Sequence, residues 1–412
     1  MKYNTHTLDN GLRIIHLPSD SKVVYCGYQI NAGTRDEEPG EEGLAHFCEH
    51  VTFKGTERRK AWHILNCLES VGGDLNAYTN KEGTVYYSAI LKEHIARAVD
   101  LLSDIVFHSV YPQAEIDKEV EVICDEIESY NDSPAELIYD EFENILFKDS
   151  SLGHNILGTA EQVRSFTTED ALRFTRKLYR PDNAIFFAYG DIDFKKLVKL
   201  VRRALADDDS GKLAAKKLPK NYPSVGEEIA GQTIVMQKNT HQAHVMIGTR
   251  AYDVNDDRRM PLYLLNNILG GPGMNAKLNL ALREHNGLVY TVESTMVAYG
   301  DTGTWSIYFG CDEHDIKRCL RLVRKELDRM MEKPLSDSQL KAAKKQIKGQ
   351  IGVACDNREN FALDFGKSFL HYGWEKNVDC LYEQVEAITS QQIQDVAREL
   401  FDKNRLITLI FK

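Results

Sequence analysis

A repeat within the chain most constrains what it can fold into. Residues 166–190 (FTTEDALRFTRKLYRPDNAIFFAYG) align without a gap with residues 388–412 (ITSQQIQDVARELFDKNRLITLIFK), at an offset of 222 positions. Both segments open with a Thr or Ser helix start, continue with apolar residues at helical spacing, and close on an apolar strand. This pattern predicts an α+β fold of two homologous lobes, each a mostly antiparallel sheet covered by helices.

The order of elements in the first half agrees with such a lobe. Strands are expected at 13–17, 23–31, 74–79, 85–90 and 184–189, and helices from about 43, at 61–71, over most of 93–146 and at 168–178. A polar stretch with paired lysines and two prolines, 207–223, is typical of a linker. We therefore expect an N-terminal lobe over 1–206, a linker over 207–228 and a C-terminal lobe over 229–412.

Composition and charge exclude several classes of protein. The 412 residues carry a formal net charge of −11, which argues against nucleic acid or an anionic membrane surface as the main partner. No apolar stretch has the length of a signal peptide or of a membrane span. The eight cysteines are scattered and form no C-x-x-C pair, which indicates free thiols. We expect a cytoplasmic protein with no membrane partner.

The segment His46-Phe47-Cys48-Glu49-His50 indicates a metal site. On an α-helix, residues four apart are separated by about 40° and lie roughly 6 Å apart, so His46 and His50 share one face. Two imidazoles at this spacing can bind one zinc ion, although such pairs also occur on helices that bind no metal. Glu49 projects about 60° away from His46, where a carboxylate can take a proton from water. The pattern is the inverted zincin motif, H-x-x-E-H.

A catalytic zinc ion normally has three protein ligands, so one more is needed. A later segment predicts a helix with a buried stripe of Ile116, Val120, Ile123 and Ile127. Glu119 and Glu126, seven residues apart, share a line at the border of that stripe. Such a pair of acids is also typical of a solvated helix face. If the border is buried, each carboxylate needs a partner: zinc for Glu126, and a ligand histidine or the reaction for Glu119.

The chain resembles a known family at these positions. Residues 46–59 (HFCEHVTFKGTERR), 72–79 (GGDLNAYT) and 179–183 (YRPDN) are similar to the pitrilysin and insulin-degrading peptidases, most closely the short branch that includes the mitochondrial processing peptidases. The 75 residues between His50 and Glu126 match the family spacing of its third zinc ligand. The resemblance implies a Zn²⁺ cofactor held by His46, His50 and Glu126, with Glu49 as general base and Glu119 beside a ligand. Cys48 departs from the larger apolar residue that is usual there.

The second half has no equivalent zinc motif, since its matching segment reads Tyr263-Leu264-Leu265-Asn266-Asn267. It does carry Arg283 and Tyr290, seven residues apart. From the sequence alone, Arg283 could simply complement the end of a helix and Tyr290 could belong to a sheet. The resemblance implies instead that Tyr290 donates a hydrogen bond to the reaction's oxyanion and that Arg283 binds a substrate carbonyl.

Together these features predict a zinc metalloendopeptidase that hydrolyses unfolded or extended peptides inside a closed chamber. The strand over 74–79 is expected to pair with the substrate, with Asn76 and Ala77 beside it. Because long family members join four lobes and this chain has two, a homodimer is expected. Two alternatives remain: an active subunit of a processing peptidase that requires a zinc-free partner, and a non-catalytic scaffold.

Overall fold

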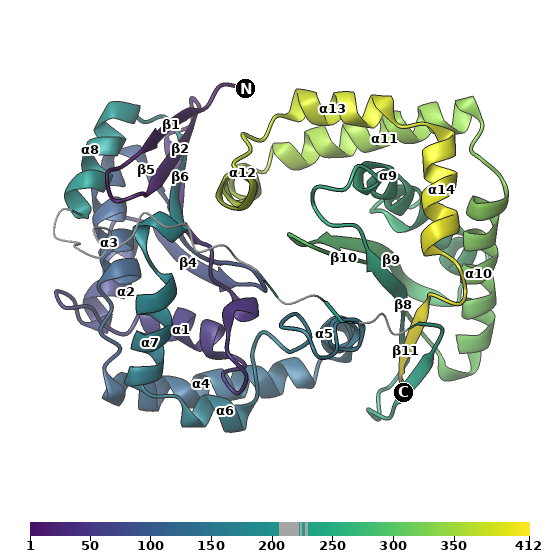
Figure 1. The fold of residues 1–412 in the computed structure, drawn as a ribbon, viewed down its shortest axis with the longest axis horizontal. Coiled ribbons are helices and arrows are strands. Elements are labelled where there is room, and N and C mark those ends of the chain that lie inside the picture. The colour runs from purple at the N-terminus through teal and green to yellow at the C-terminus, as the bar shows by residue number, and fades with distance from the viewer. Residues whose placement is uncertain (206–221, 223–224, 227–229) are drawn as a thin grey trace. The chain divides into compact units, whose positions relative to one another are not determined.

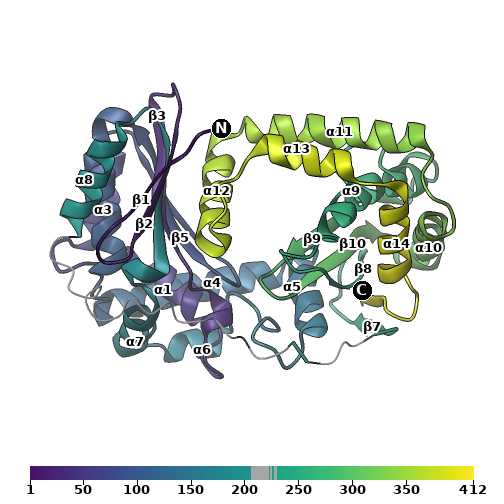
Figure 2. The same ribbon diagram turned by 45° about the horizontal axis from the view of Figure 1, so that its top comes forward.

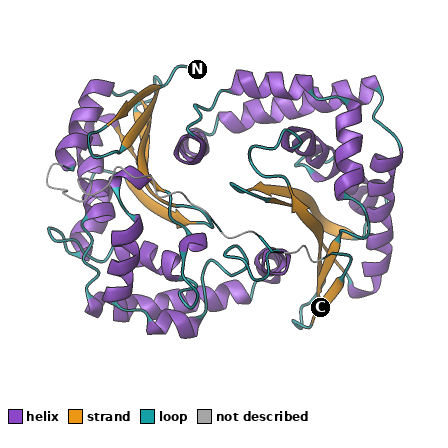
Figure 3. Ribbon diagram, viewed as in Figure 1, coloured by secondary structure: helices purple, strands orange, loops and turns teal. Residues whose placement is uncertain are grey.

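The computed structural model describes residues 1–205, 222, 225–226 and 230–412. They form two units, each with its own sheet and helices (Figures 1 and 3). The first unit comprises Met1–Glu128, His154–Tyr222 and Ala354–Asn377, and the second comprises Ser129–Gly153, Pro223–Val353 and Val378–Lys412. The predicted α+β class is confirmed. The predicted linker, 207–228, lies almost wholly outside the described residues.

The described residues of the first unit form a six-stranded sheet. In spatial order its strands are β1 (Asn4–Thr7), β2 (Arg13–Pro18), β6 (Ala184–Gly190), β3 (Val23–Ile30), β5 (Thr84–Leu91) and β4 (Asp74–Thr79). Strands β2 and β6 run parallel and the other neighbours are antiparallel. Every strand expected in this half is present, whereas β1 was not predicted. Strand β4, with the bounds expected from the sequence, lies at the sheet edge.

Helices cover both faces of this sheet. The helices of the first unit are η1 (Thr34–Asp36), α1 (Leu44–Thr52), α2 (Ala61–Glu69), η2 (Lys92–His94), α3 (Ile95–Phe107), α4 (Gln113–Asn131), α6 (Ala160–Ser165), α7 (Thr168–Leu178), η3 (Pro181–Asn183), α8 (Phe194–Ala204) and α12 (Arg358–Tyr372). Neighbouring residues of β3 show the alternation: Tyr28 hydrogen-bonds Ser103 of α3, while Gln29 donates to the carbonyl of Leu363 in α12. Helix α12 therefore packs on the face opposite α3 (Figure 2).

The second unit repeats this plan. Its described strands form the order β7 (Thr233–Met236), β11 (Ile407–Phe411), β8 (Ala243–Ala251), β10 (Gly303–Cys311) and β9 (Val289–Ala298). Its helices are α5 (Pro134–Leu146), α9 (Arg259–Gly270), the π-helix η5 (Asn279–Glu284), η6 (Glu313–Asp315), α10 (Ile316–Glu332), α11 (Asp337–Cys355), α13 (Val378–Ala387) and α14 (Ser390–Leu400). As with β2 and β6, the pair β7 and β11 is parallel, and the rest of the sheet is antiparallel.

The repeat seen in the sequence is visible in local detail. Helix α7 begins with a capping box between Thr167 and Asp170, and α14 begins with one between Thr389 and Gln392. The second box follows the first by 222 residues, and each helix leads into an interior strand of its sheet, β6 or β11. A capping box satisfies two backbone N–H groups at a helix start, which explains why this local pattern could be recognised from sequence.

The division into units differs from the contiguous halves expected from the sequence. Residues 129–153, which include α5, belong to the second unit, and residues 354–377, which include α12, belong to the first. Phe142 of α5 lies in one apolar cluster with Met246 and Leu409 of the second sheet. Phe365 of α12 packs edge-on against Tyr189 of the first sheet, with ring centroids 6.3 Å apart. Each half thus supplies one helix to the sheet of the other, because an amphipathic helix can bury its apolar face against either sheet.

Candidate metal centre

Helix α1, which carries the two histidines, has a fixed starting point. Gly43 precedes it with φ +95°, and a Cβ atom there would lie 2.7 Å from the carbonyl oxygen of Leu157. Since Gly43 has no side chain with which to cap the helix, Glu37 provides the cap. Its Oε1 accepts a hydrogen bond from the Ala45 N–H at 2.7 Å, and its Oε2 accepts one from the Gly43 N–H at 3.1 Å. A buried carboxylate therefore satisfies donors at the positive end of the helix.

Three side chains converge where the sequence predicted zinc ligands. The rings of His46 and His50 lie side by side on α1, with centroids 4.6 Å apart. Glu126 of α4 approaches both: its Oε2 is 3.2 Å from His50 Nε2 and 3.9 Å from His46 Nε2. Two ligands about 2.0–2.1 Å from a zinc ion at a tetrahedral angle would be about 3.3 Å apart. The observed separations are close to that value.

The surroundings of His46 also fit a metal ion. Its Nε2 faces Glu126, while the other ring nitrogen, the buried Nδ1, has no hydrogen-bond partner among the described residues. Burial, followed by the neighbouring His50, lowers the pKa of His46 to about 4, so the ring is neutral as a ligand must be. Two imidazole nitrogens and one carboxylate oxygen form the donor set of a catalytic zinc site with one position left for water. His46, His50 and Glu126 therefore fit a zinc ion.

Glu119 forms a hydrogen bond with His50. Its Oε1 lies 3.1 Å from His50 Nδ1, and its Oε2 lies 2.5 Å from Lys54 Nζ. Burial raises the pKa of Glu119, but the hydrogen bonds from His50 and Lys54 outweigh it and lower the pKa below its ordinary value. Burial likewise lowers the pKa of His50, yet its bonds to Glu119 and Glu126 raise it to about 9 in the metal-free protein. Glu119 thus occupies the position beside a ligand that the sequence indicated.

Glu49 lies on α1 between the two histidines in sequence and faces strand β4. Its Oε2 accepts a hydrogen bond of 2.6 Å from Thr79 Oγ1, at the end of β4. Burial raises the pKa of Glu49 above its ordinary value, with the negative charge of Glu126 adding to the effect. A carboxylate that is fixed at one oxygen and has a raised pKa is suited to accept and release a proton.

The two residues expected beside a substrate lie on β4. Asn76 is exposed and is paired across the sheet with Tyr87, whereas Ala77 is half-buried and paired with Tyr86. Since β4 is the edge strand, one side of its backbone has no neighbouring strand in the part of the chain that the structure describes. Such an edge can accept a further extended segment.

Arg283 and Tyr290 are brought together in the second unit. Arg283 lies in the π-helix η5, and Tyr290 is the second residue of β9. The guanidinium carbon is 5.5 Å from the centre of the Tyr290 ring, and the tyrosine is 85% exposed. Between them the chain turns at Gly287 with φ +61°, as the Asn286-Gly287 pair indicated. The predicted helical turn is present, but as a π-helix, for which the residues carry no recognisable signal.

Three residues at this site were not singled out from the sequence. Lys54 lies four residues after His50 and so continues the same helical face beyond the last residue of α1, which is a usable signal. Thr79 is the last residue of the predicted edge strand, but its partner Glu49 is 30 positions away. Glu37 precedes the helix by several residues and reaches it only because η1 turns the chain back. Neither of the last two contacts has a local sequence pattern.

Comparisons with known proteins show what the chain is similar to. Residues 14–160 match the family model described as insulinase (peptidase family M16), and residues 165–347 match the model described as peptidase M16 inactive domain. An uncharacterized zinc protease of Streptomyces coelicolor is 32% identical over 409 residues, covering 98% of this chain and 88% of that protein. The uncharacterized zinc protease YmxG of Bacillus subtilis is 30% identical over 407 residues, covering 98% of this chain and 97% of that protein.

Solved structures share the fold. A protease from Helicobacter pylori superimposes with a TM-score of 0.89 at 20% identity, covering 100% of this chain and 99% of that chain. A peptidase M16 inactive domain from Pseudomonas fluorescens gives a TM-score of 0.89 at 16% identity, covering 100% of this chain and 98% of that chain. In the part of this chain that the structure describes, no helix is both long and apolar enough to cross a membrane. The eight cysteines are free thiols, as expected.

Proposed function

Because the chain belongs to the insulinase family of peptidases, family M16, we propose that it is a zinc metalloendopeptidase that hydrolyses unfolded or extended peptides. The observation that supports this most directly is the convergence of His46, His50 and Glu126, with Glu49 adjacent on the same helix. A non-catalytic scaffold would have no use for a general base beside a complete ligand set. The non-catalytic alternative is therefore the weaker one.

The residues divide the work of hydrolysis between them. A zinc ion, when bound by His46, His50 and Glu126, supplies Lewis acidity toward the peptide carbonyl and the attacking water. Glu49, held at Oε2 by Thr79, takes the proton of that water at its other oxygen. As the carbon–oxygen bond forms and the carbon–nitrogen bond breaks, Glu49 passes this proton to the leaving amine.

The second unit would complete the site with polar donors. In this proposal the Tyr290 hydroxyl donates a hydrogen bond to the oxyanion that develops on the carbonyl, and Arg283 binds a backbone carbonyl of the substrate. The exposure of Tyr290 supports such a role, because its hydroxyl is free to meet a substrate. Strand β4 would bind the peptide as an additional strand beside Asn76 and Ala77, through main-chain bonds that do not depend on sequence.

We also propose that two copies of the chain form a homodimer with a closed chamber, in which the first unit of one copy faces Arg283 and Tyr290 of the other. A chain that carries both residue groups does not need a different, zinc-free partner, which argues against the processing-subunit alternative. The cytoplasmic location is a prediction that cell fractionation would test.

The proposal is tested by metal content and cleavage together. The purified protein should contain about one zinc ion per chain and cleave unstructured peptides, and a chelator should abolish cleavage until zinc is restored. His50→Ala should lose both the metal and the activity. Full activity after verified removal of the metal, or full zinc content in His50→Ala, would overturn the proposal.

A further inference from the structure

Lys54 is not one of the proposed catalytic or metal-binding residues, but it forms an ion pair with Glu119, which contacts His50. It is the second residue after helix α1, and its backbone N–H still donates to the Val51 carbonyl at 3.1 Å. Its ammonium group lies 2.5 Å from Glu119 Oε2, and this pair is largely shielded, with side-chain exposures of 24% for Lys54 and 13% for Glu119. An ion pair that is mostly withdrawn from solvent holds its geometry more firmly than one on the surface.

The two oxygens of Glu119 have different partners. Lys54 binds Oε2, which leaves Oε1 to accept from His50 Nδ1 at 3.1 Å. A proton held on Nδ1 leaves the lone pair on Nε2, the nitrogen that faces Glu126. The His46 Nδ1 atom has no such partner among the described residues. Of the two ligand histidines, only His50 therefore has its tautomer and ring orientation set by a carboxylate that is itself held.

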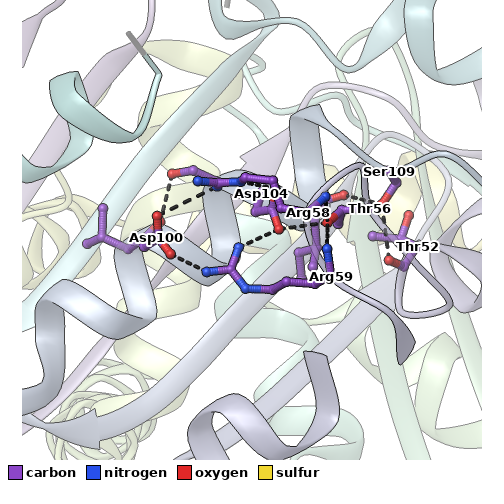
Figure 4. A network of polar contacts seen from close by, with 10 residues as sticks. Thr52, Thr56, Arg58, Arg59, Asp100, Asp104 and Ser109 are labelled. Atoms are coloured by element: carbon purple, nitrogen blue, oxygen red, sulfur yellow. Dashed lines mark hydrogen bonds and ion pairs between the residues drawn. The ribbon is translucent and has the colours of Figure 1, made fainter. Parts of the chain in front are cut away.

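The backbone that carries Lys54 is fixed by a separate polar network (Figure 4). Before Lys54, the Thr52 carbonyl accepts from Ser109 Oγ at 3.1 Å. After it, Thr56 Oγ1 donates to Asp104 Oδ2 at 2.8 Å. The Asp104 side chain is fully buried and also accepts from Arg58 Nε and from Arg59. The segment after α1 is therefore hydrogen-bonded on both sides of Lys54, to Asp104 of α3 and to Ser109 just after that helix.

We propose that Lys54 is a positioning residue for the metal centre, acting through Glu119 to fix the tautomer and orientation of His50. This inference rests on the proposed zinc function and extends it to a residue that touches neither metal nor substrate. Partners of this kind, one step removed from the ligands, typically change metal affinity by about 10- to 100-fold when they are lost.

The chain offers a matched control for this role. Lys118, the residue before Glu119 on α4, forms an exposed pair with Glu115 at 2.8 Å and contacts none of the ligands. Lys54→Met and Lys118→Met each remove one ammonium group from a lysine–glutamate pair while keeping a side chain of similar length. Lys54→Arg retains the positive charge. Zinc affinity is measured by competition with a chromophoric chelator, and the ligand geometry is followed by the absorption spectrum of the Co²⁺-substituted protein.

Lys54→Met should weaken zinc binding about 10-fold and alter the Co²⁺ spectrum, whereas Lys118→Met should change neither. Lys54→Arg should restore most of the affinity. Because the effect passes through Glu119, Lys54→Met should weaken zinc binding no further in a Glu119→Ala background. Unchanged zinc affinity and spectrum in Lys54→Met, or an equal loss in the Glu119→Ala background, would overturn this inference alone. Failure of the wild-type protein to bind zinc would overturn the proposed function and this inference together.

Discussion

Helices α1 and α9 occupy equivalent places in the two repeats, yet their polar side chains differ in how fully they are hydrogen-bonded within the protein. Helix α1 follows β3 and packs against the edge strand β4, and helix α9 follows β8 and packs against the edge strand β9. In α9, the side chain of Asn266 donates to the Ser294 carbonyl at 2.9 Å and accepts hydrogen bonds from the Ser294 hydroxyl and from Trp305 Nε1. In α1, the Nδ1 atom of His46 has no partner among the described residues.

This difference separates a structural site from a binding site. The amide of Asn266 is satisfied within the protein and ties its helix to the edge strand and to the core. In α1, His46 and His50 instead bring a ring nitrogen each within 4.8 Å of a carboxylate oxygen of Glu126. The first repeat thus has a group of side chains that fits a metal ion, where the second has a packed structural contact.

The largest effect is expected from a substitution at Glu49, which tests whether α1, unlike α9, is catalytic. Glu49→Gln should lower the turnover of an unstructured peptide by about 10²- to 10⁴-fold, because an amide cannot take a proton from water. Zinc content should stay at the wild-type level, since Glu49 is not a ligand. Asn267→Ala in α9 is the control and should keep wild-type turnover. Retention of most of the turnover in Glu49→Gln would show that the base lies elsewhere.

The next effect concerns the second repeat, which has no equivalent zinc motif but carries the exposed Tyr290 beside Arg283. Tyr290→Phe should lower kcat by about 10²- to 10³-fold, as for the loss of one donor to an oxyanion, with little change in zinc affinity. Single-turnover measurements separate this loss from product release. A Tyr290→Phe variant with wild-type kcat would remove the tyrosine from the proposed mechanism.

Mixing two inactive variants tests whether the two repeats act across a dimer. Suppose Glu49→Gln and Tyr290→Phe chains pair at random in a symmetric two-chain assembly. If the residues work in trans, each mixed dimer has one doubly damaged site and one intact site, so about a quarter of the wild-type activity should return. If they work within one chain, both sites of every dimer stay damaged. No recovery despite demonstrated subunit exchange would exclude the trans arrangement.

A smaller effect, on stability alone, is expected at Asn266. Asn266→Ala would leave the buried Trp305 Nε1 and the Ser294 hydroxyl without their shared acceptor, which should cost about 1–3 kcal/mol of unfolding free energy. Urea unfolding followed by Trp fluorescence measures this loss, with Asn267→Ala as the control because that side chain makes none of the three bonds. The loss should be the same with and without zinc. A zinc-dependent loss would contradict the purely structural role of Asn266.

The sequence was sufficient where the structure is local. The residues His46, Glu49 and His50 lie on one helical turn, so helical periodicity alone placed them together. The bounds of β4 and α7 followed from alternation and from a capping box, respectively, which are patterns of a few adjacent residues. Helical periodicity was not sufficient for Glu126. Its spacing from His50, which resembles the family spacing, identified it as the third ligand.

The remaining features depend on packing between distant segments. Periodicity shows which face of α5 or α12 is apolar but not which of two similar sheets that face covers, so the exchange of helices could not be predicted. The bonds of Glu49 to Thr79 and of Lys54 to Glu119 join different elements and depend on how α1 sits against β4 and α4. The same applies to the capping of α1 by Glu37.

The smallest expected effect is on the stability of the zinc-free protein, and it tests whether the Glu49 carboxylate of α1 is unsatisfied without a metal. Glu49→Gln should stabilise the zinc-free protein by about 0.5–1 kcal/mol at neutral pH, because it removes a half-buried negative charge near Glu126 while keeping an acceptor for Thr79. Burial raises the pKa of Glu49, so the wild-type carboxyl begins to cost stability as the pH rises past the ordinary pKa of the unfolded chain, and the cost is complete above the raised pKa of the folded protein. The gain should therefore be present at neutral pH and absent in acid. Thermal unfolding of chelator-treated wild type and variant at both pH values measures it. A destabilised variant at neutral pH would mean that the Glu49 carboxylate is satisfied without a metal, and α1 would then resemble α9.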